Sequence, residues 1–205
     1  MRHTIPVKQV FSTYDWHALD DSGLYKYCPL CGTQLAQKEI ADKQRPTCSS
    51  CGFVQFRNPV PGVVVVIEQE GCVLLGKRRG GYGEGKWGLP QGYIEFDEDY
   101  LSAAIREVKE ETGLDVEIRS ILNVVSNLLS PRLQTLAIVL LAGVVGGQLC
   151  AADDMEHLEW VPMSGPLPEM AFEADEHIVE RYQTKQTGVG LAVDPDFARS
   201  RDGIA

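Results

Sequence analysis

The sequence predicts an α/β domain preceded by a small cysteine-rich module, and three observations support this prediction. Residues 63–67 form a continuous β-branched run, which is typical of a strand buried on both faces. Residues 97–112 carry apolar side chains at helical spacing. Two C-x-x-C pairs precede both segments. With 205 residues, 44% of them hydrophobic, the chain can form one medium domain together with a small module.

The first two segments of the chain have different patterns. Residues 1–24 contain apolar side chains without a clear period, and we expect an arm that packs on the body or joins a dimer contact. Residues 25–57 hold two knuckles of the form C-x-x-C-G, separated by 16 residues. This spacing matches a structural zinc ribbon with four thiolate ligands. The ligands predicted for Zn²⁺ are Cys28, Cys31, Cys48 and Cys51.

Other interpretations of these cysteines remain open, because an iron site or a redox dithiol pair would use the same residues. In a chain without a recognisable export signal, paired C-x-x-C is more typical of a metal site than of disulfides. The segment is too short for a substantial core, so the metal would supply much of its stability. Its basic residues are few and scattered, which favours a packing or oligomerisation module over a nucleic-acid binder.

The pattern of residues 58–83 indicates the first strands of a β-sheet. After a hinge with the sequence N-P-V-P-G, the strand at 63–67 turns at 69–71 into a hairpin partner at 72–76. The basic residues 77–79 end this strand, where they either face solvent or contact a substrate phosphate. The glycine-rich loop that follows lacks the Lys-Ser/Thr and the helix of a P-loop, so we exclude that nucleotide motif.

One amphipathic helix is expected over about 97–112. Its apolar stripe recurs at i, i+3, i+4 and i+7 and consists of Leu101, Ala104, Ile105 and Val108. Asp97 is the predicted N-cap, and Gly113 stands where a left-handed residue ends a helix. This helix would therefore bury one face and leave its acidic side chains on the neighbouring face.

The acidic face holds Glu107, Glu110 and Glu111, which lie at i, i+3 and i+4. Carboxylates this close repel one another, and a divalent cation would relieve that repulsion. Hard oxygen ligands suit Mg²⁺ or Mn²⁺ rather than Zn²⁺. Arg106 could hold Glu107 by a charge-assisted hydrogen bond. Taken alone, three glutamates at this spacing are also compatible with a solvated helix face.

The complete pattern, however, resembles the Nudix box at every specified position. It consists of Gly92, five residues, Glu98, seven residues, R-E-V, one residue, E-E, one residue and G-L. The resemblance implies a Nudix α/β/α sandwich with a mixed sheet and a Mg²⁺-dependent hydrolase. Its substrate would be a nucleoside diphosphate linked to another moiety. Water attack on such a diphosphate requires neutralisation of its charge and a carboxylate that accepts a proton.

The box also assigns roles to particular residues of this chain. The resemblance implies metal ligation by the Gly92 carbonyl and by Glu107, Glu110 and Glu111, with Glu98 and Arg106 supporting them. The general base would be Glu110 or an acid from a later loop. In Nudix proteins a Glu or Asp ahead of a W-V strand often approaches the metals. Here Glu156 is our first choice, followed by Asp154 and Glu159, although each is also compatible with a solvated loop acid.

The rest of the domain is expected to extend to residue 183. We predict short strands at 116–118 and 121–125, a polar loop at 126–132 and a long strand at 133–145. A terminal helix is predicted at 173–182. Residues 184–205 show little periodicity and are expected to form a disordered tail.

The order of ribbon, N-P-x-P hinge and box resembles two groups of enzymes, the NADH pyrophosphatases and the ribbon-bearing ADP-ribose and FAD pyrophosphatases. The first group usually carries S-Q-P-W-P-F-P-x-S after the box, and residues 126–131 lack that motif. The segment M-A-F-E at 170–173 resembles the second group. ADP-ribose or FAD is therefore the favoured substrate, and NADH is the alternative. A nucleotide-sensing regulator without catalysis is the alternative from another class.

Charge and hydropathy restrict the partners. The net charge of −10 and the absence of basic runs argue against nucleic-acid binding and against an RNA cap hydrolase with a basic groove. No apolar stretch reaches the roughly 20 residues that a membrane span needs. Without a recognisable secretory signal, we expect a cytoplasmic protein that binds a small nucleotide, and a homodimer is the default assembly.

Overall fold

The computed structural model describes residues 5, 8–12, 24–184 and 191–192. These residues fall into two compact units. The larger unit contains the residues up to Phe11, Val60–Asn127 and the chain from Thr135 onward. The smaller unit contains the cysteine module up to Pro59 and the segment Leu128–Gln134.

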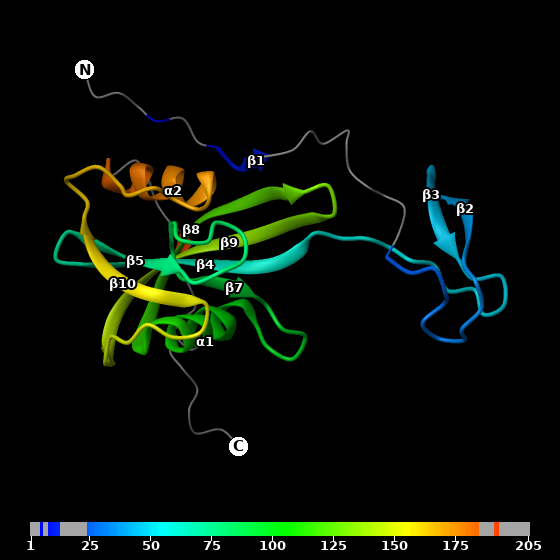
Figure 1. Ribbon diagram of the computed structural model, residues 1–205, viewed down its shortest axis with the longest axis horizontal. Coiled ribbons are helices and arrows are strands. Elements are labelled where there is room, and N and C mark those ends of the chain that lie inside the picture. The colour runs from blue at the N-terminus through cyan, green and yellow to red at the C-terminus, as the bar shows by residue number, and fades with distance from the viewer. Residues whose placement is uncertain (1–4, 6–7, 13–23, 185–190, 193–205) are drawn as a thin grey trace. The chain divides into compact units, whose positions relative to one another are not determined.

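A mixed sheet of nine strands forms the centre of the larger unit (Figure 1). Its order is β1-β8-β9-β4-β5-β10, while β7 pairs with β4, β6 with β5 and β11 with β8. Strand β4 runs parallel to β9 and antiparallel to β5. The strands are β1 (Val10–Ser12), β4 (Val60–Gln69), β5 (Cys72–Arg78), β6 (Trp87–Gly88), β7 (Gln91–Tyr93), β8 (Leu114–Ser130), β9 (Leu133–Gly147), β10 (Met155–Pro162) and β11 (Leu191–Ala192).

Strand β4 is a central strand of this sheet, buried on both faces as the β-branched run predicts. Its residues from Val63 to Ile67 are at most 3% exposed. Side chains alternate along a strand, so Val63 and Val65 enter one hydrophobic cluster, whereas Val64 and Val66 enter another. Full burial of each such side chain contributes about 1.5–3 kcal/mol.

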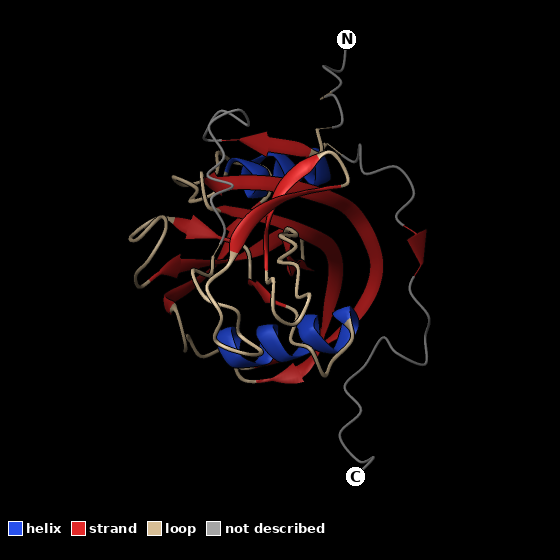
Figure 2. Cartoon of the chain, turned by 90° about the vertical axis from the view of Figure 1, so that its right-hand side faces the viewer, coloured by secondary structure: helices blue, strands red, loops and turns tan. Residues whose placement is uncertain are grey.

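The two clusters lie under different helices, which gives the sandwich its layers. Helix α1 (Tyr100–Thr112) contributes to the first cluster, and α2 (Glu173–Gln183) contributes to the second. Figures 1 and 2 show the two helices on opposite sides of the sheet. The expected α/β/α sandwich with a mixed sheet is confirmed.

The helix that carries the box begins later than the sequence predicts. Asp99, and not Asp97, is the N-cap, because its Oδ1 accepts hydrogen bonds of 2.9 and 3.0 Å from Leu101 N and Ser102 N. The predicted apolar stripe is buried. The predicted stop is also confirmed, since Gly113 has a φ of 72° and its N–H donates to Lys109 O.

The predicted polar loop at 126–132 is wrong. Strand β8 is continuous to Ser130, and the connection to β9 is a turn at residues 131–132. Sheet pairing overrides the polar character of this stretch, as the hydrogen bond of 2.8 Å from Ser126 N to Gln9 O illustrates. The buried side chain of Val125 also anchors this part of β8 in the hydrophobic cluster under α2.

Parts of both terminal segments pack on the larger unit. Strand β1 is adjacent to β8, and Phe11 is only 4% exposed in the cluster under α2. In the predicted tail, Leu191 and Ala192 pair with Ile121 and Ser120 of β8. Most of the remaining tail lies outside the described residues.

The smaller unit is built on a short hairpin. Strands β2 (Ala36–Ile40) and β3 (Lys43–Thr47) pair antiparallel, and their turn residues Ala41 and Asp42 have φ angles of 49° and 59°. Within the described residues, no helix of either unit is long and apolar enough to cross a membrane.

Candidate functional site

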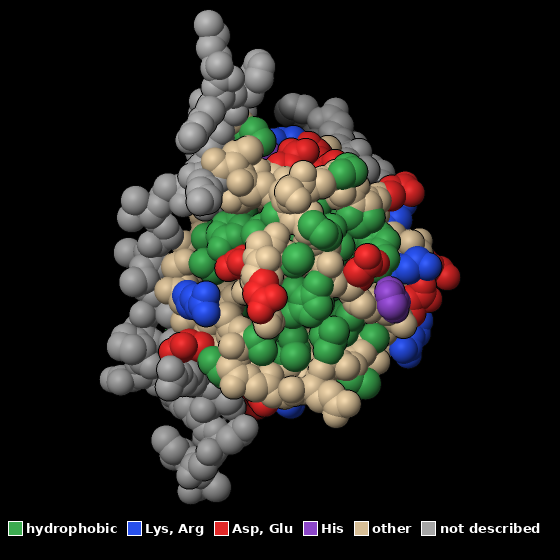
Figure 3. Space-filling model, turned by 90° about the vertical axis from the view of Figure 1, so that its left-hand side faces the viewer, with side chains coloured by type: hydrophobic (Ala, Val, Ile, Leu, Met, Phe, Trp, Pro, Cys, Tyr) green, Lys and Arg blue, Asp and Glu red, His purple; other side chains and the backbone are tan. Residues whose placement is uncertain are grey.

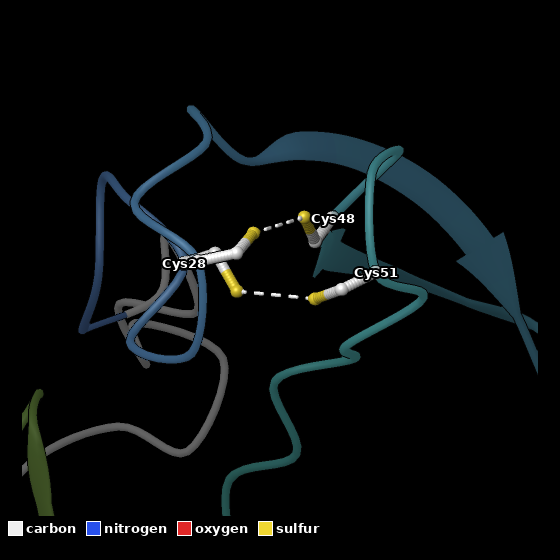
Figure 4. Close-up of side chains that lie close together, drawn as sticks. Cys28, Cys48 and Cys51 are labelled. Carbon is white, nitrogen blue, oxygen red and sulfur yellow. Dashed lines mark hydrogen bonds between the residues drawn. The ribbon is translucent and has the colours of Figure 1, made fainter.

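The four predicted zinc ligands converge in the smaller unit. Their sulfur atoms all lie within 4.8 Å of one another. Cys28 Sγ is 3.5 Å from Cys51 Sγ, and Cys31 Sγ is 3.4 Å from Cys48 Sγ, so each knuckle faces the other (Figure 4). Hydrogen bonding with the side chain and backbone of Thr33 lowers the pKa of the Cys31 thiol to about 6.

This geometry fits a tetrahedral thiolate site. Zinc–sulfur bonds of about 2.3 Å place the sulfurs of a tetrahedron about 3.8 Å apart, close to the observed separations. The knuckles are closed by backbone hydrogen bonds from Gly32 N to Cys28 O and from Gly52 N to Cys48 O. Gly32 and Gly52 have φ angles of 72° and 79°, a conformation that favours glycine. The sequence therefore builds a site that fits Zn²⁺ with a closed coordination shell.

The second candidate site lies along α1. Glu107 and Glu111 are 8% and 1% exposed, although glutamate is rarely so buried, whereas the side chain of Glu110 is 50% exposed. Burial raises the pKa of Glu107. Burial also raises the pKa of Glu111, to about 10, and the adjacent carboxyl group of Asp154 adds to this shift.

Arg106 connects the carboxylates of the box. Its guanidinium donates hydrogen bonds of 2.8 Å to Glu107 Oε1 and 2.9 Å to Glu110 Oε2. On its other side it makes bonds of 2.6 and 3.0 Å to the two oxygens of Glu98, and it also reaches Tyr93 O. The bond to Arg106 holds the pKa of Glu98 below its usual range. The predicted contact between Arg106 and Glu107 is present.

Asp154 adjoins the buried Glu111, although its own side chain is 42% exposed. Its Oδ1 atom is buried and has no hydrogen-bond partner by geometry among the described residues, while Oδ2 accepts a bond of 3.0 Å from Arg78 Nη2. A buried carboxylate oxygen without a donor is unfavourable unless a proton or a cation compensates it. Glu111 and Asp154 therefore form a pair that a shared proton or a cation would stabilise.

Close packing around Gly92 is consistent with such a site. A Cβ atom added to Gly92 would lie 2.0 Å from Cδ of Glu107, so only glycine admits the carboxylate. The Gly92 carbonyl oxygen lies near Gly62, where an added Cβ would approach it to 2.9 Å. Oxygen atoms of this kind suit Mg²⁺ or Mn²⁺. The carboxylates of Glu107, Glu111 and Asp154 have the donor chemistry for a divalent cation, although among the described residues only the four cysteines already converge as metal ligands.

The structure places Glu156 away from this group. Its carboxylate pairs with Lys77 Nζ at 2.9 Å, and this pairing lowers its pKa. The register between β5 and β10 shifts between Met155 and His157, so Glu156 is the extra residue of a bulge. Met155 is fully buried against Gly76 and leaves its neighbour exposed. Of the three acids that the sequence proposes here, Asp154 is the one beside Glu111.

The basic residues at the end of β5 all contact the segment that contains Asp154. Lys77 pairs with Glu156, and Arg79 donates to Met155 O. Arg78 bonds Asp154 and also donates a hydrogen bond of 2.9 Å to Tyr82 O. On the molecular face in Figure 3, basic side chains likewise lie beside acidic ones at the edges.

Two residues near the site are not indicated by the box pattern. The backbone N–H of Gln91 donates to Glu111 Oε2 at 3.0 Å, and Asp175 on α2 accepts from Leu89 N and Gln91 Nε2. A sequence signal for Asp175 exists, since this acid lies three and four positions before the buried Ile178 and Val179.

Comparisons with known proteins agree with this geometry. A family model described as NUDIX domain matches residues 57–182. The chain is 35% identical over 134 residues to a protein of Methanocaldococcus jannaschii named ADP-ribose pyrophosphatase. This alignment covers 65% of this chain and 78% of that protein. It is 26% identical over 174 residues to a Pseudomonas aeruginosa protein named NAD-capped RNA hydrolase NudC. This second alignment covers 83% of this chain and 60% of that protein. The chain thus spans less than two thirds of the second relative.

A solved structure is similar over most of the chain. The crystal structure of a NUDIX hydrolase from Nitrosomonas europaea superposes with a TM-score of 0.70 at 25% sequence identity. The match covers 83% of this chain and 97% of that one.

Proposed function

Because the chain belongs to the Nudix hydrolase family, we propose that it is a cation-dependent pyrophosphatase acting on a nucleoside diphosphate linked to another moiety. The observation that carries this proposal is the carboxyl group of Glu111, which is 1% exposed and adjoins the carboxyl group of Asp154. Such a pair is stable only when a proton or a cation compensates its charge. The proposed cations are Mg²⁺ and Mn²⁺.

The residues proposed to hold the cations are the Gly92 carbonyl, Glu107, Glu110, Glu111 and Asp154. Bound there, the cations would supply positive charge that neutralises the diphosphate and lowers the pKa of the attacking water. Arg106 keeps Glu107 and Glu110 oriented through its two Nη1 hydrogen bonds. Glu110 is proposed as the general base, because its half-exposed carboxylate can reach water while Glu111 is buried.

Asp154 replaces Glu156 as the acid that we propose from the later loop. Its carboxyl group adjoins that of Glu111, whereas Glu156 is exposed and paired with Lys77. A role for Glu156 in catalysis remains a prediction from the sequence. His157 makes an edge-on contact with the ring of Trp87, which favours a packing role over that of a base.

ADP-ribose is the substrate that we propose first. The support is the 35% identity to a protein named ADP-ribose pyrophosphatase, together with the absence of S-Q-P-W-P-F-P-x-S after the box. FAD is proposed next, because the ribbon-bearing group that the chain resembles includes FAD pyrophosphatases. Both molecules contain an ADP moiety, so the same site would accept the same half of either one.

A dinucleotide that contains nicotinamide is the second candidate. The similarity to the NudC protein extends over 174 residues, more than the matched NUDIX domain alone contains. This observation favours NADH or NAD as the substrate, and either one should be tested beside ADP-ribose. The zinc ribbon is proposed to be structural, and a homodimer and a cytoplasmic location remain predictions.

The test is a substrate panel of ADP-ribose, FAD, NADH, dinucleoside polyphosphates and nucleoside triphosphates with Mg²⁺ or Mn²⁺. A coupled phosphatase releases phosphate from the products. Glu110→Gln is compared with the wild type, and Glu176→Gln on the exposed face of α2 is the control. We expect one dinucleotide to dominate, no turnover by Glu110→Gln and normal turnover by the control. Tight nucleotide binding without turnover in the wild type would instead support the regulator.

A further inference from the structure

Asp175 is a buried acid outside the box. It lies in the first turn of α2 and is only 1% exposed. Its Oδ2 accepts a hydrogen bond of 3.0 Å from the backbone N–H of Leu89 and one of 3.3 Å from Nε2 of Gln91. These donors belong to the segment that leads directly into Gly92.

The segment that Asp175 holds is also held from two other directions. Strand β4 binds it through the hydrogen bond of 2.8 Å from Val65 N to Pro90 O. Helix α1 binds it through the hydrogen bond of 3.0 Å from Gln91 N to Glu111 Oε2. Gln91 therefore bonds Asp175 through its side chain and Glu111 through its backbone. A path of two hydrogen bonds joins α2 to the acidic face of α1.

A purely structural role does not explain the burial of this carboxylate. At the first turn of a helix an acid interacts favourably with the helix dipole even when it faces water. Arg78 is the cation near Asp175, but its guanidinium donates to Tyr82 O and Asp154, so its charge offsets the burial only in part. An apolar residue at this position would pack without these costs.

Glycine at position 88 makes this approach possible. An added Cβ at Gly88 would lie 3.3 Å from Asp175 Oδ2 and 3.5 Å from Gln91 Nε2. The polypeptide before the box is thus shaped to bring the carboxylate against the Gln91 amide. In this contact the Gln91 side chain donates through its NH₂ group and Asp175 Oδ2 accepts.

We propose that Asp175 is a positioning residue, which orients Gln91 and through it the carboxylate of Glu111. This inference rests on the proposed function, because it takes Glu111 as a ligand of the catalytic cation. Asp175 itself touches neither substrate nor cation in this role. Its effect is to keep Glu111 Oε2 bonded to the backbone N–H of Gln91. The remaining carboxylate oxygen of Glu111, Oε1, then has a fixed orientation for binding the cation.

The variant Asp175→Asn tests the charge of the acceptor. Asparagine keeps the size of the side chain, but its neutral oxygen accepts the bonds from Leu89 N and Gln91 Nε2 more weakly than a carboxylate oxygen does. The Gln91 side chain is then held less firmly, and so is the residue whose backbone N–H bonds Glu111. Partners of metal ligands typically change metal affinity by about 10–100-fold when they are altered.

The experiment measures Mn²⁺ binding to the metal-depleted active site of the full chain by electron paramagnetic resonance, with zinc left in the ribbon. We expect Asp175→Asn to weaken Mn²⁺ binding by about tenfold or more. The concentration of Mg²⁺ that gives half-maximal activity should rise equally, with activity recovering at saturating Mg²⁺. Glu176→Gln, one position along the same helix and exposed, should match the wild type in both measurements.

Gln91→Met is the second variant, because it keeps the length of the side chain and removes its donor. It should weaken Mn²⁺ binding like Asp175→Asn, and the double variant should be no worse than either single one. Wild-type Mn²⁺ affinity in folded Asp175→Asn or in Gln91→Met would overturn the inference. Wild-type Mn²⁺ affinity in Glu111→Gln would contradict the proposed function instead, so the two failures are distinguishable.

Discussion

Gln91 and Glu111 lie 20 positions apart in the sequence and are joined by a hydrogen bond of 3.0 Å from a backbone N–H to a buried carboxylate oxygen. This bond connects strand β7 to helix α1, which carries the acidic face. It also explains how Glu111 can be 1% exposed and still have a donor for one of its oxygens. The other groups of the candidate active site are arranged around this pair.

Gly92→Ala should abolish most activity while leaving the chain folded. The added methyl group would occupy the space of the Glu107 carboxylate, with Cβ 2.0 Å from Cδ, so that side chain must move away. Overpacking of this kind costs about 1–3 kcal/mol, which a thermal melt detects. Gly80→Ala is the control, because no atom lies within 4 Å of its added Cβ. Equal activity of the two variants would show that Glu107 need not stay beside Gly92.

Arg106→Lys should reduce kcat by about 10–100-fold, the range typical for partners of metal ligands. A lysine keeps the charge but cannot bond Glu98, Glu107 and Glu110 at once, as the guanidinium does. The control is Lys109→Ala on the same helix, which removes an exposed pair with Asp115 and should cost less than about 1 kcal/mol. Steady-state kinetics of both variants measures kcat. Full activity of Arg106→Lys would contradict the proposed role of Arg106 in orienting the carboxylates.

The metal-free protein should lose stability as the pH rises from about 4 to about 7, and Asp175→Asn should lack this component. Burial raises the pKa of Asp175 from 3.8 to about 7, although the bond from Leu89 N, the charge of Arg78 and the bond from Gln91 lower it. In this window the native state retains a proton that the unfolded state has released, so the free energy of unfolding falls as pH rises. We expect the difference between the two proteins to change by roughly 2–4 kcal/mol and then stay constant.

Urea unfolding of both metal-depleted proteins between pH 4 and pH 8 measures this effect. Glu111 is present in both proteins, so its own titration cancels in the comparison. Parallel stability curves across the whole range would mean that Asp175 is ionised in the native state already at pH 4.

Cys48→Ser should lower the zinc content of the purified chain from about one ion to much less than one, because one of four thiolate ligands is lost. Cys150→Ser is the matched control, since Cys150 is exposed and lies outside the cysteine cluster. Elemental analysis of both variants, together with the release of zinc by a chelator, provides the measurement. Iron in place of zinc would support the iron site that the sequence leaves open, and a metal-free chain would support the redox dithiol pair.

The sequence by itself determined those features that depend on local periodicity and fixed spacing. The run at 63–67 specified a strand buried on both faces, and the burial of its residues confirms it. Helical spacing predicted which face of α1 is apolar, and two knuckles predicted which sulfurs meet. In each case the signal lies in the periodicity of one element or in the spacing of short motifs.

The tertiary structure alone decided which residues from distant segments reach the site. A bulge between Met155 and His157 exposes Glu156, and burial of Met155 leaves Asp154 beside Glu111. The continuity of β8 through a polar stretch likewise depends on sheet pairing. Register and helix docking are set by packing over the whole domain, and no local pattern encodes them. For the same reason the contact of Asp175 with Gln91 becomes visible only when α2 is packed against the sheet.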